Sequence, residues 1–328
     1  MGALVSDPMH WHLGAGRGKD LTGKTTNSHH LNYVLITPAR NEAEFIESTI
    51  QSVVQQTLRP LRWIIVSDGS TDGTDDIVQN YTSEYPWIEL VRQPERAERH
   101  FAGKVIAFNH GYARVSQLDY EIIGNLDADI SFEPDYFAFL IRKFAENPRL
   151  GVGGTPFREG SDQYNYKFTS IEHVSGACQL FRRRCFEEIG GYTPIKGGGI
   201  DLVAVTTARM KAWHTETFPE KACIHHRPMG TASHNVLKAC FRQGAKDYAL
   251  GTHPLWEFVR SFYQMTKRPF FIGGCLLLWG FAWSMIKRTN MPVPPELVSF
   301  RRREQMHRLK TFIRRVVPNG FPIDVDGS

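Results

Sequence analysis

Short apolar segments alternate with segments of helical spacing in the first part of this 328-residue chain. The apolar segments are residues 31–36, 61–67, 88–91 and 120–126. Helical spacing follows the first three of them, over residues 44–54, 75–81 and 104–116. Asn41 and Glu44 predict a capping box at the start of the first helix. Because continuous apolar strands joined by helices are typical of a buried parallel sheet, we predict an α/β fold with a Rossmann-like, mainly parallel central sheet and helices on both faces.

The pattern changes after Asp129. The later segments predict a helix over 134–146, a strand over 150–155, a helix over 201–213 and a strand over 215–224. Residues beyond 230 have helical spacing, whereas residues 1–30 have no period and predict a mobile leader. We therefore divide the chain into a leader (1–30), an α/β domain (31–230), a helical region (231–290) and a basic tail (291–328).

One segment of the helical region has the composition of a membrane element. Residues 270–286 are 17 residues without a charge, between two Lys-Arg pairs at 267–268 and 287–288. Since a spanning helix needs about 20 apolar residues, this segment is at the short limit for one. Three of its aromatic residues resemble an interfacial belt: Trp279, Phe281 and Trp283. We expect a membrane-associated helix, while an interfacial, a re-entrant, a spanning and a buried core helix all remain possible interpretations.

Charge and cysteine content restrict the partners and the compartment. The net charge is +5, and nine Lys or Arg residues lie between 287 and 315, a distribution that suits anionic lipid or nucleic acid. The sequence contains no nucleic-acid-binding motif, so we expect no nucleic acid partner. The five cysteines are odd in number and never spaced as CxxC. This argues against a disulfide framework or a zinc site, and it favours a reducing compartment.

Polar residues follow three of the predicted strands, where ligands bind in open α/β sheets. The first strand ends in residues 37–42, the second in residues 67–73, and the fourth in Asp127-Ala128-Asp129. Two carboxylates that flank a small residue can reach one hard cation, and Mg²⁺ and Mn²⁺ share such oxygen ligands with phosphates. The alternative is a turn in which the aspartates bind backbone N–H groups.

Four motifs follow one another in a defined order and spacing: Pro38-Ala-Arg-Asn-Glu42, Ser67-Asp-Gly-Ser-Thr-Asp-Gly73, Gly103-Lys104 with Asn109 and Gly111, and Asp127-Ala-Asp129. This set resembles family 2 glycosyltransferases over about residues 33–227. The resemblance implies a GT-A-like fold, a nucleotide-diphosphate-sugar donor such as a UDP- or GDP-sugar, a divalent metal (Mg²⁺ or Mn²⁺), and inversion at the anomeric carbon.

The resemblance also assigns roles to individual residues. It places the nucleotide base and ribose near Pro38, Arg40, Glu42 and Asp68. Lys104 matches a lysine that approaches the donor diphosphate, Asp127 is placed near the ribose or the metal, and Asp129 on the metal itself. Two structural alternatives remain open. Glu42 can belong to the first helical turn, and Lys104 can be a solvated helix charge.

The predicted general base lies in a glycine-rich segment, Gly197-Gly-Gly-Ile-Asp201. The family presents an acidic pair here; in this chain Ile200 replaces the first member, so only Asp201 remains. The alternative is that Asp201 serves as a helix N-cap. Further along, His225 or His226 is a candidate metal ligand, with His225 preferred, and Arg227 can pair with a diphosphate bidentately.

We therefore predict an inverting, metal-dependent glycosyltransferase with a lipid-linked or polysaccharide acceptor, docked to a membrane surface with its catalytic domain in the cytoplasm. The Gln-x-x-Arg-Trp signature of processive members is missing, so transfer of one sugar per encounter is expected. One rival is a sugar nucleotidyltransferase, for which the only candidate phosphate loop is the P-loop-like run 18–25, poorly placed for that role. The other rival is a non-catalytic membrane- or nucleic-acid-binding module that uses the basic tail.

Overall fold

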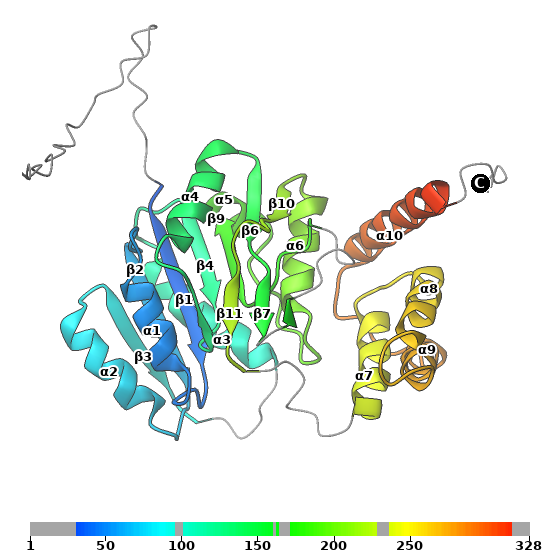
Figure 1. Cartoon of the computed structure of the whole chain (residues 1–328), viewed down its shortest axis with the longest axis horizontal. Helices are drawn as coiled ribbons and strands as arrows, with labels where there is room; N and C mark the ends of the chain where they lie inside the picture. The colour runs from blue at the N-terminus through cyan, green and yellow to red at the C-terminus, as the bar shows by residue number, and fades with distance from the viewer. Residues whose placement is uncertain (1–30, 96–100, 160–161, 164–170, 228–235, 317–328) are drawn as a thin grey trace, which may run out of the picture. The chain divides into compact units, whose positions relative to one another are not determined.

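The computed structural model describes residues 31–95, 101–159, 162–163, 171–227 and 236–316. The predicted leader, with its P-loop-like run, and the end of the basic tail lie outside the described residues. Within the described part, a large sheet with helices on both faces carries the polar loops predicted above (Figure 1).

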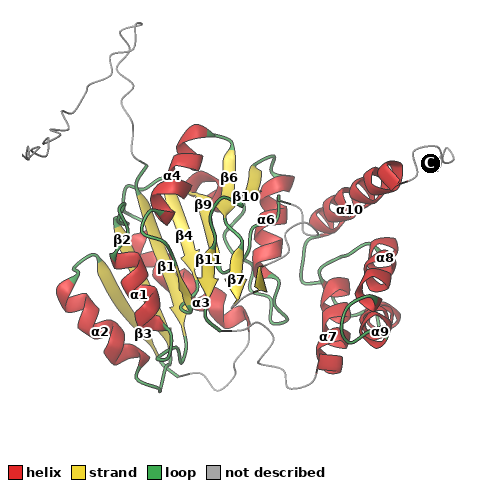
Figure 2. Ribbon diagram, in the orientation of Figure 1, coloured by secondary structure: helices red, strands yellow, loops and turns green. Residues whose placement is uncertain are grey.

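The central sheet has seven strands in the order β10-β6-β9-β4-β1-β2-β3 (Figure 2). Their bounds are β1 Tyr33–Ala39, β2 Arg62–Asp68, β3 Ile88–Gln93, β4 Ile122–Leu126, β6 Leu150–Gly154, β9 Cys178–Arg182 and β10 His214–Thr217. Strands β4, β1, β2 and β3 are parallel neighbours, as predicted. Strand β9, which the sequence did not predict, runs antiparallel between β4 and β6.

Both faces of the sheet are covered, because alternate residues of each strand enter different cores. Tyr33 and Leu35 pack in one core, and Val34 and Ile36 in the other. The first core receives α1 Ile46–Val54, α2 Thr74–Glu84 and α4 Tyr136–Glu146. The second receives α3 Phe101–Val115, α5 Arg183–Glu188 and α6 Ile200–Met210. This two-sided burial explains why the strands read as continuous apolar runs.

A small second sheet connects distant parts of the chain. Its order is β5-β11-β7-β8, with bounds β5 Ile130–Ser131, β11 Cys223–His225, β7 Phe157–Glu159 and β8 Asp162–Gln163. The prediction of one strand over 215–224 is therefore wrong. A turn at Pro219 and Glu220 divides it into β10 in the large sheet and β11 in the small one, because proline cannot continue a strand ladder.

The predicted capping box at the first helix is also wrong. Helix α1 begins at Ile46, and its N-cap residue Phe45 makes no side-chain capping bond. Asn41 has a φ of 56°, and its Oδ1 accepts a hydrogen bond from the Thr71 N–H at 2.8 Å. Asn41 thus joins the first polar loop to the second instead of starting the helix.

The helical prediction beyond residue 230 is confirmed for the described residues. The helices are α7 Val236–Ala249, α8 Pro254–Met265, α9 Ile272–Ile286 and α10 Pro295–Val316. None of the helices in the described ranges is both long and apolar enough to cross a membrane. The domain boundaries at 230 and 290 stay predictions.

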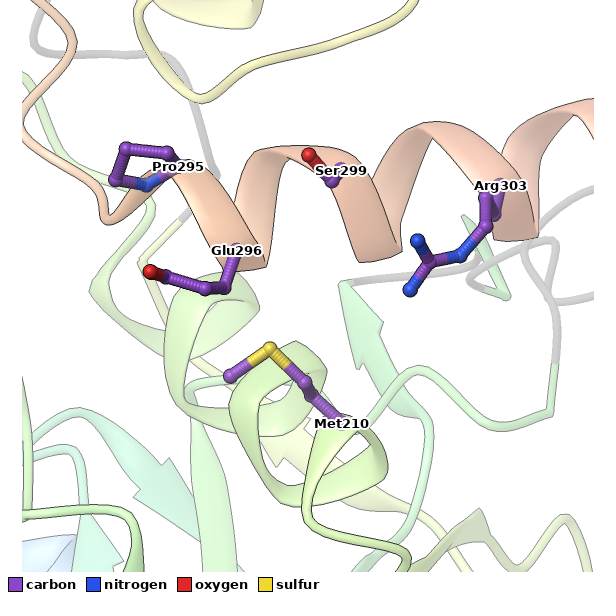
Figure 3. A pocket seen from close by; sticks show the side chains of 5 residues that line it. All are labelled: Met210, Pro295, Glu296, Ser299 and Arg303. Atoms are coloured by element: carbon purple, nitrogen blue, oxygen red, sulfur yellow. The ribbon is translucent and has the colours of Figure 1, made fainter. Parts of the chain in front are cut away.

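Helix α10, which lies in the predicted basic tail, packs on helix α6. Arg209 of α6 donates to both carboxylate oxygens of Glu304 in α10, at 2.7 and 2.9 Å. A cavity of about 410 Å³ lies between the two helices (Figure 3). Met210, Pro295, Glu296, Ser299 and Arg303 line it, and none of them is a predicted site residue.

An ionic group is buried among the C-terminal helices. Glu257 of α8 is 0% exposed and lies near Asp247 of α7 and the guanidinium groups of Arg260 and Arg301. Burial, together with the charge of Asp247, raises the pKa of Glu257 to about 7, against the opposing effect of Arg260 and Arg301. This carboxyl group is therefore easier to bury in its protonated form.

The raised pKa of Glu257 predicts how stability changes with pH. Between the ordinary value of 4.5 and about 7, the folded protein holds a proton that the unfolded chain has released, so stability falls as pH rises through this window. In Glu257→Gln the free energy of unfolding should fall less than in wild type between about pH 5 and about pH 8. The difference between the two falls should be at most about 3 kcal/mol. Urea unfolding at a series of pH values measures it. The exposed Glu296→Gln is the control, and equal pH dependence in wild type and Glu257→Gln would contradict the prediction.

Candidate active site

The first two polar loops are held together at the carboxyl end of β1 and β2. Backbone N–H groups of the first loop donate to side chains of the second: Asn41 to Ser70 Oγ at 3.1 Å, Glu42 to Thr74 Oγ1 at 2.8 Å, and Ala43 to Asp72 Oδ2 at 2.9 Å. These bonds fix the backbone on which four predicted donor-binding residues stand: Pro38, Arg40, Glu42 and Asp68. Of these, Arg40 Nη1 lies 3.9 Å from Asp68 Oδ2.

Asp127, Asp129 and His225 form one group at the exit of β4, called the acidic group below. Each offers a ligand atom, and the three atoms lie within 4.8 Å of one another. The small sheet creates this group, because β11 pairs with β5 in a register that puts His225 opposite Ile130. The loop between the aspartates is fixed on both sides: the Asp127 N–H donates to Ala177 O at 2.9 Å, and Asp129 O accepts from the His226 N–H at 2.8 Å.

The ligand atoms of the acidic group fit a divalent cation such as Mn²⁺ or Mg²⁺. Two carboxylates suit both ions, and an imidazole nitrogen is a better ligand for a transition metal than for Mg²⁺. His225 Nε2 lies 3.7 Å from Asp129 Oδ1. Its Nδ1 is buried and makes no hydrogen bond to any described residue, and Glu159 Oε1 lies 3.3 Å from it. The structure also separates the two histidines, because His226 Nε2 is 2.9 Å from Ser131 Oγ and outside the group.

Lys104, in the first turn of α3, contacts Asp127 directly. Burial lowers the pKa of Lys104, but the negative charges of Asp127, Asp201 and Asp129 raise it by more. The pKa of Lys104 is therefore above its ordinary value. Burial likewise raises the pKa of Asp127, and the contact with Lys104 opposes that rise. Lys104 is therefore not a solvated helix charge. It is a fixed ammonium among three aspartates.

Asp201 lies in the first turn of α6 but does not cap it. The N-cap is Gly199, with a φ of 86° and no side-chain capping bond, so the N-cap alternative is wrong. The Asp201 side chain packs against Gly176, where a Cβ would be 3.0 Å from Asp201 Cβ and 3.2 Å from Oδ2. Gly176 in turn accepts a hydrogen bond from Asn125 Nδ2 at 3.0 Å. Asp201 therefore stands next to the strand that leads to Asp127.

Arg227 links the first polar loop to the acidic group. Its guanidinium pairs with Glu42 through two nitrogens, and its Nε lies 3.9 Å from Asp129 Oδ2. The guanidinium also lies over the Phe45 ring at 5.2 Å. Glu42 also takes part in the turn that opens α1, because its carbonyl oxygen accepts hydrogen bonds from the Phe45 and Ile46 N–H groups at 3.0 and 2.8 Å. The helix-turn interpretation therefore holds for its backbone, while its side chain binds Arg227.

Residues 34–194 match the family model described as glycosyl transferase family 2. The chain carries a family 2 glycosyltransferase domain. The domain includes the first two polar loops, Lys104 and both aspartates of the acidic group, whereas Asp201, His225 and Arg227 follow it.

Curated relatives of this glycosyltransferase domain are poly-beta-1,6-N-acetyl-D-glucosamine synthases. The protein of Staphylococcus epidermidis strain RP62A is 26% identical over 170 residues, which are 46% of this chain and 39% of that relative. The protein of Staphylococcus aureus strain COL is 30% identical over 136 residues, 41% of this chain and 31% of the relative. The chain thus matches less than half the length of these relatives.

Solved structures share the fold of the glycosyltransferase domain. The mannosyltransferase PcManGT from Pyrobaculum calidifontis, in complex with GDP-Man and Mn²⁺, aligns with a TM-score of 0.53 at 17% identity, over 89% of both chains. Residues 1–349 of S. aureus TarS in complex with UDP-GlcNAc align with a TM-score of 0.50 at 16% identity, over 87% of this chain and 82% of that one. Together with the strand order, these likenesses confirm a GT-A-like fold.

Sequence reasoning missed three residues that shape the site. Gly176 and Asn125 position the Asp201 and Asp127 segments, and Glu159 lies beside His225. Asn125 gave a signal, since it is a polar residue inside the apolar strand before Asp127. Gly176 and Glu159 gave none, because their role comes from contacts between segments far apart in the chain.

The acidic group predicts which side chains bind a cation. Asp129→Asn and His225→Ala should each weaken Mn²⁺ binding by about tenfold or more, because each removes a ligand atom. Titration of Mn²⁺ by electron paramagnetic resonance, in the presence of nucleoside diphosphate, measures the effect. His226→Asn should bind Mn²⁺ like wild type, since His226 bonds to Ser131 instead. Equal losses in the two histidine variants would contradict the assignment.

Proposed function

We propose that the protein transfers one sugar at a time from a nucleotide-diphosphate-sugar donor to an acceptor hydroxyl, with inversion at the anomeric carbon. The observation that carries this proposal is the convergence of the acidic group, Lys104 and Asp201 at one edge of a GT-A-like sheet. A UDP- or GDP-sugar is the expected donor. TarS and PcManGT, which share the fold, were solved with UDP-GlcNAc and GDP-Man.

Donor binding would use the joined loops of β1 and β2. The base and ribose would lie near Pro38, Arg40, Glu42 and Asp68. The paired side chains present both carboxylates and guanidinium groups to a polar ligand. A divalent cation held by Asp127, Asp129 and His225 would offset the charge that develops on the leaving diphosphate. Lys104 and Arg227 supply fixed positive charge at the same place.

Asp201 would act as the general base. The acceptor oxygen forms a bond to the anomeric carbon while the bond from that carbon to the diphosphate oxygen breaks. The hydroxyl proton passes to the Asp201 carboxylate. Attack opposite the leaving group inverts the anomeric configuration. Such proton transfer is typically worth about 10²–10⁴ in rate.

The acceptor is proposed to be a lipid-linked sugar or a polysaccharide. A hollow of about 300 Å³ opens beside the glycine-rich segment that precedes Asp201. Gly197 and Gly198 line it together with Lys196 and Lys246. Two ammonium groups beside the segment that carries the base suit an acceptor with a phosphate, as a lipid-linked sugar has.

Two experiments distinguish the proposed transferase from its two rivals: analysis of the reaction products and deletion of residues 291–328. A transferase releases free nucleoside diphosphate from the donor, whereas a sugar nucleotidyltransferase makes or consumes pyrophosphate. A non-catalytic binding module would release neither, and its binding would disappear with residues 291–328. Donor turnover assayed by product analysis is therefore the first experiment.

Asp201→Asn tests the general base. The rate constant kcat should fall by about 10²–10⁴, because the amide cannot accept the proton. Mn²⁺ and nucleotide binding should not change, since Asp201 is outside the group of ligand atoms. The control is Asp76→Asn, an exposed aspartate in the first turn of α2. Unchanged kcat in Asp201→Asn would remove Asp201 from the mechanism.

Gly176→Ala tests the placement of Asp201. The added Cβ would be 3.0 Å from Asp201 Cβ, closer than ordinary contact, so the carboxylate must move. We expect kcat to fall by about tenfold or more, because small displacements of a catalytic group are costly, with little change in Tm. Gly273→Ala in α9 is the matched control, since a Cβ there would be 3.4 Å or more from its neighbours. Full activity of Gly176→Ala would show that this contact does not position the base.

A further inference from the structure

Helices α8 and α9 have the burial pattern of a membrane protein, with polar residues inside and large apolar residues outside. In α8 the buried residues are Glu257 and Ser261, both 0% exposed. The opposite face carries four exposed residues at helical spacing: Leu255, Phe258, Val259 and Phe262. In water this arrangement leaves the apolar face solvated, so the face requires a partner.

Helix α9 shows the same distribution. Its exposed stripe has helical spacing and consists of Ile272, Cys275, Trp279, Trp283 and Ile286. Its inner face consists mostly of small residues, Gly273, Gly274, Gly280 and Ser284, together with Leu277 and Phe281. Phe270 and Phe271, at the start of α9, are 61% and 66% exposed. The two tryptophans, which are the largest side chains of the helix, therefore point away from its neighbours.

Glycines hold these helices together. A Cβ at Gly244 of α7 would be 1.9 Å from Leu277 O in α9, and one at Gly280 of α9 would be 2.0 Å from Phe241 O in α7. A Cβ at Gly274 would be 2.3 Å from Ser261 O in α8. Close backbone approach at small residues is how helices pack where lipid removes the hydrophobic drive between them.

The charges around this apolar face are basic. Among residues 254–288, all charged residues that are exposed are cationic: Lys267, Arg268, Lys287 and Arg288. They lie at the two ends of α9, and the Lys287 ammonium lies over the Trp283 ring at 5.0 Å. A face of aromatic residues bordered by Lys and Arg complements an anionic lipid surface. It is a poor match for a second copy of the same face, because like charges would meet.

We propose that this face of α8 and α9, with residues 270–271 between them, inserts into the interface of an anionic lipid bilayer without crossing it. Helix α9 has 15 residues, about 22 Å of helix against an apolar core of about 30 Å, so it is too short to span. Its aromatic residues reach the boundary between headgroups and acyl chains. The inference does not rest on the transferase site. That the catalytic domain faces the cytoplasm stays a separate prediction.

Vesicle binding by the full chain tests the apolar part of the face. Wild type should sediment with vesicles of phosphatidylcholine and phosphatidylglycerol, and its tryptophan emission should shift to shorter wavelength. The double variant Trp279→Ser/Trp283→Ser should partition at least on the order of tenfold more weakly, because two exposed aromatic side chains no longer leave water. Leu61→Ser, at a residue 45% exposed beside β2, is the matched control and should bind like wild type.

The basic border is tested separately. Lys287→Ser/Arg288→Ser should weaken binding to vesicles with phosphatidylglycerol by about tenfold and change binding to pure phosphatidylcholine little. Arg142→Ser, an exposed residue of α4, is its control. Circular dichroism verifies that each variant is folded.

Two results would overturn the proposal. The first is that the wild-type protein binds neither kind of vesicle. The second is that the wild type is a dimer, and that Trp279→Ser/Trp283→Ser makes it a monomer without changing vesicle binding. A second copy of the chain would then be the partner of this face. Both results are obtained without donor or acceptor, so they are distinct from a failure of the transferase proposal.

Discussion

The site depends on how the charges of four carboxylates are balanced at one edge of the sheet. These are Glu42, Asp127, Asp129 and Asp201. Buried like charges are costly unless cations lie among them. Lys104 supplies one positive charge at Asp127, and Arg227 supplies another between Glu42 and Asp129. The remaining negative charge favours a divalent cation. A donor phosphate that binds Arg227 must compete with Glu42, so donor binding would rearrange this ion pair.

The sequence predicted those features of the site that depend on local pattern. Apolar runs followed by polar loops identified the parallel strands and the edge at which Asp68 and Asp127 lie. The sequence did not predict which distant segments pair with one another. The bond between Arg227 and Glu42 joins residues 185 apart, and nothing in either segment indicates the other. Strand β9 was missed for the same reason, since its antiparallel place between β4 and β6 is fixed by tertiary contacts.

The helical region follows a different physical logic from the α/β domain. In the domain, large apolar side chains fill two cores on either side of the sheet. In α8 and α9 the interior contains Leu277 and Phe281, but otherwise it consists of glycines, serines and the carboxyl group of Glu257. A composition-based prediction for residues 270–286 recognised an apolar segment, but it could not tell which side chains face outward. That information comes from the burial of each residue in α9, and in α8 from the buried Glu257 and Ser261, on which the sequence prediction placed no weight.

Helix α6 connects the candidate active site to the C-terminal helices. Its first turn carries Asp201, and in its last turn Arg209 binds Glu304 of α10 through two hydrogen bonds. The glycine that precedes it, Gly199, leaves space for Leu250 at the end of α7, because a Cβ there would be 2.5 Å from Leu250 Cδ1. Asp201, the proposed base, thus lies on a helix that contacts the helical region at its first turn and the basic tail at its last turn. If α8 and α9 lie in a lipid interface, this connection sets the distance between that interface and the carboxylate. An acceptor carried by a lipid would then bring its hydroxyl to Asp201 from the membrane side, whereas the proposed nucleotide donor would bind at the sheet edge.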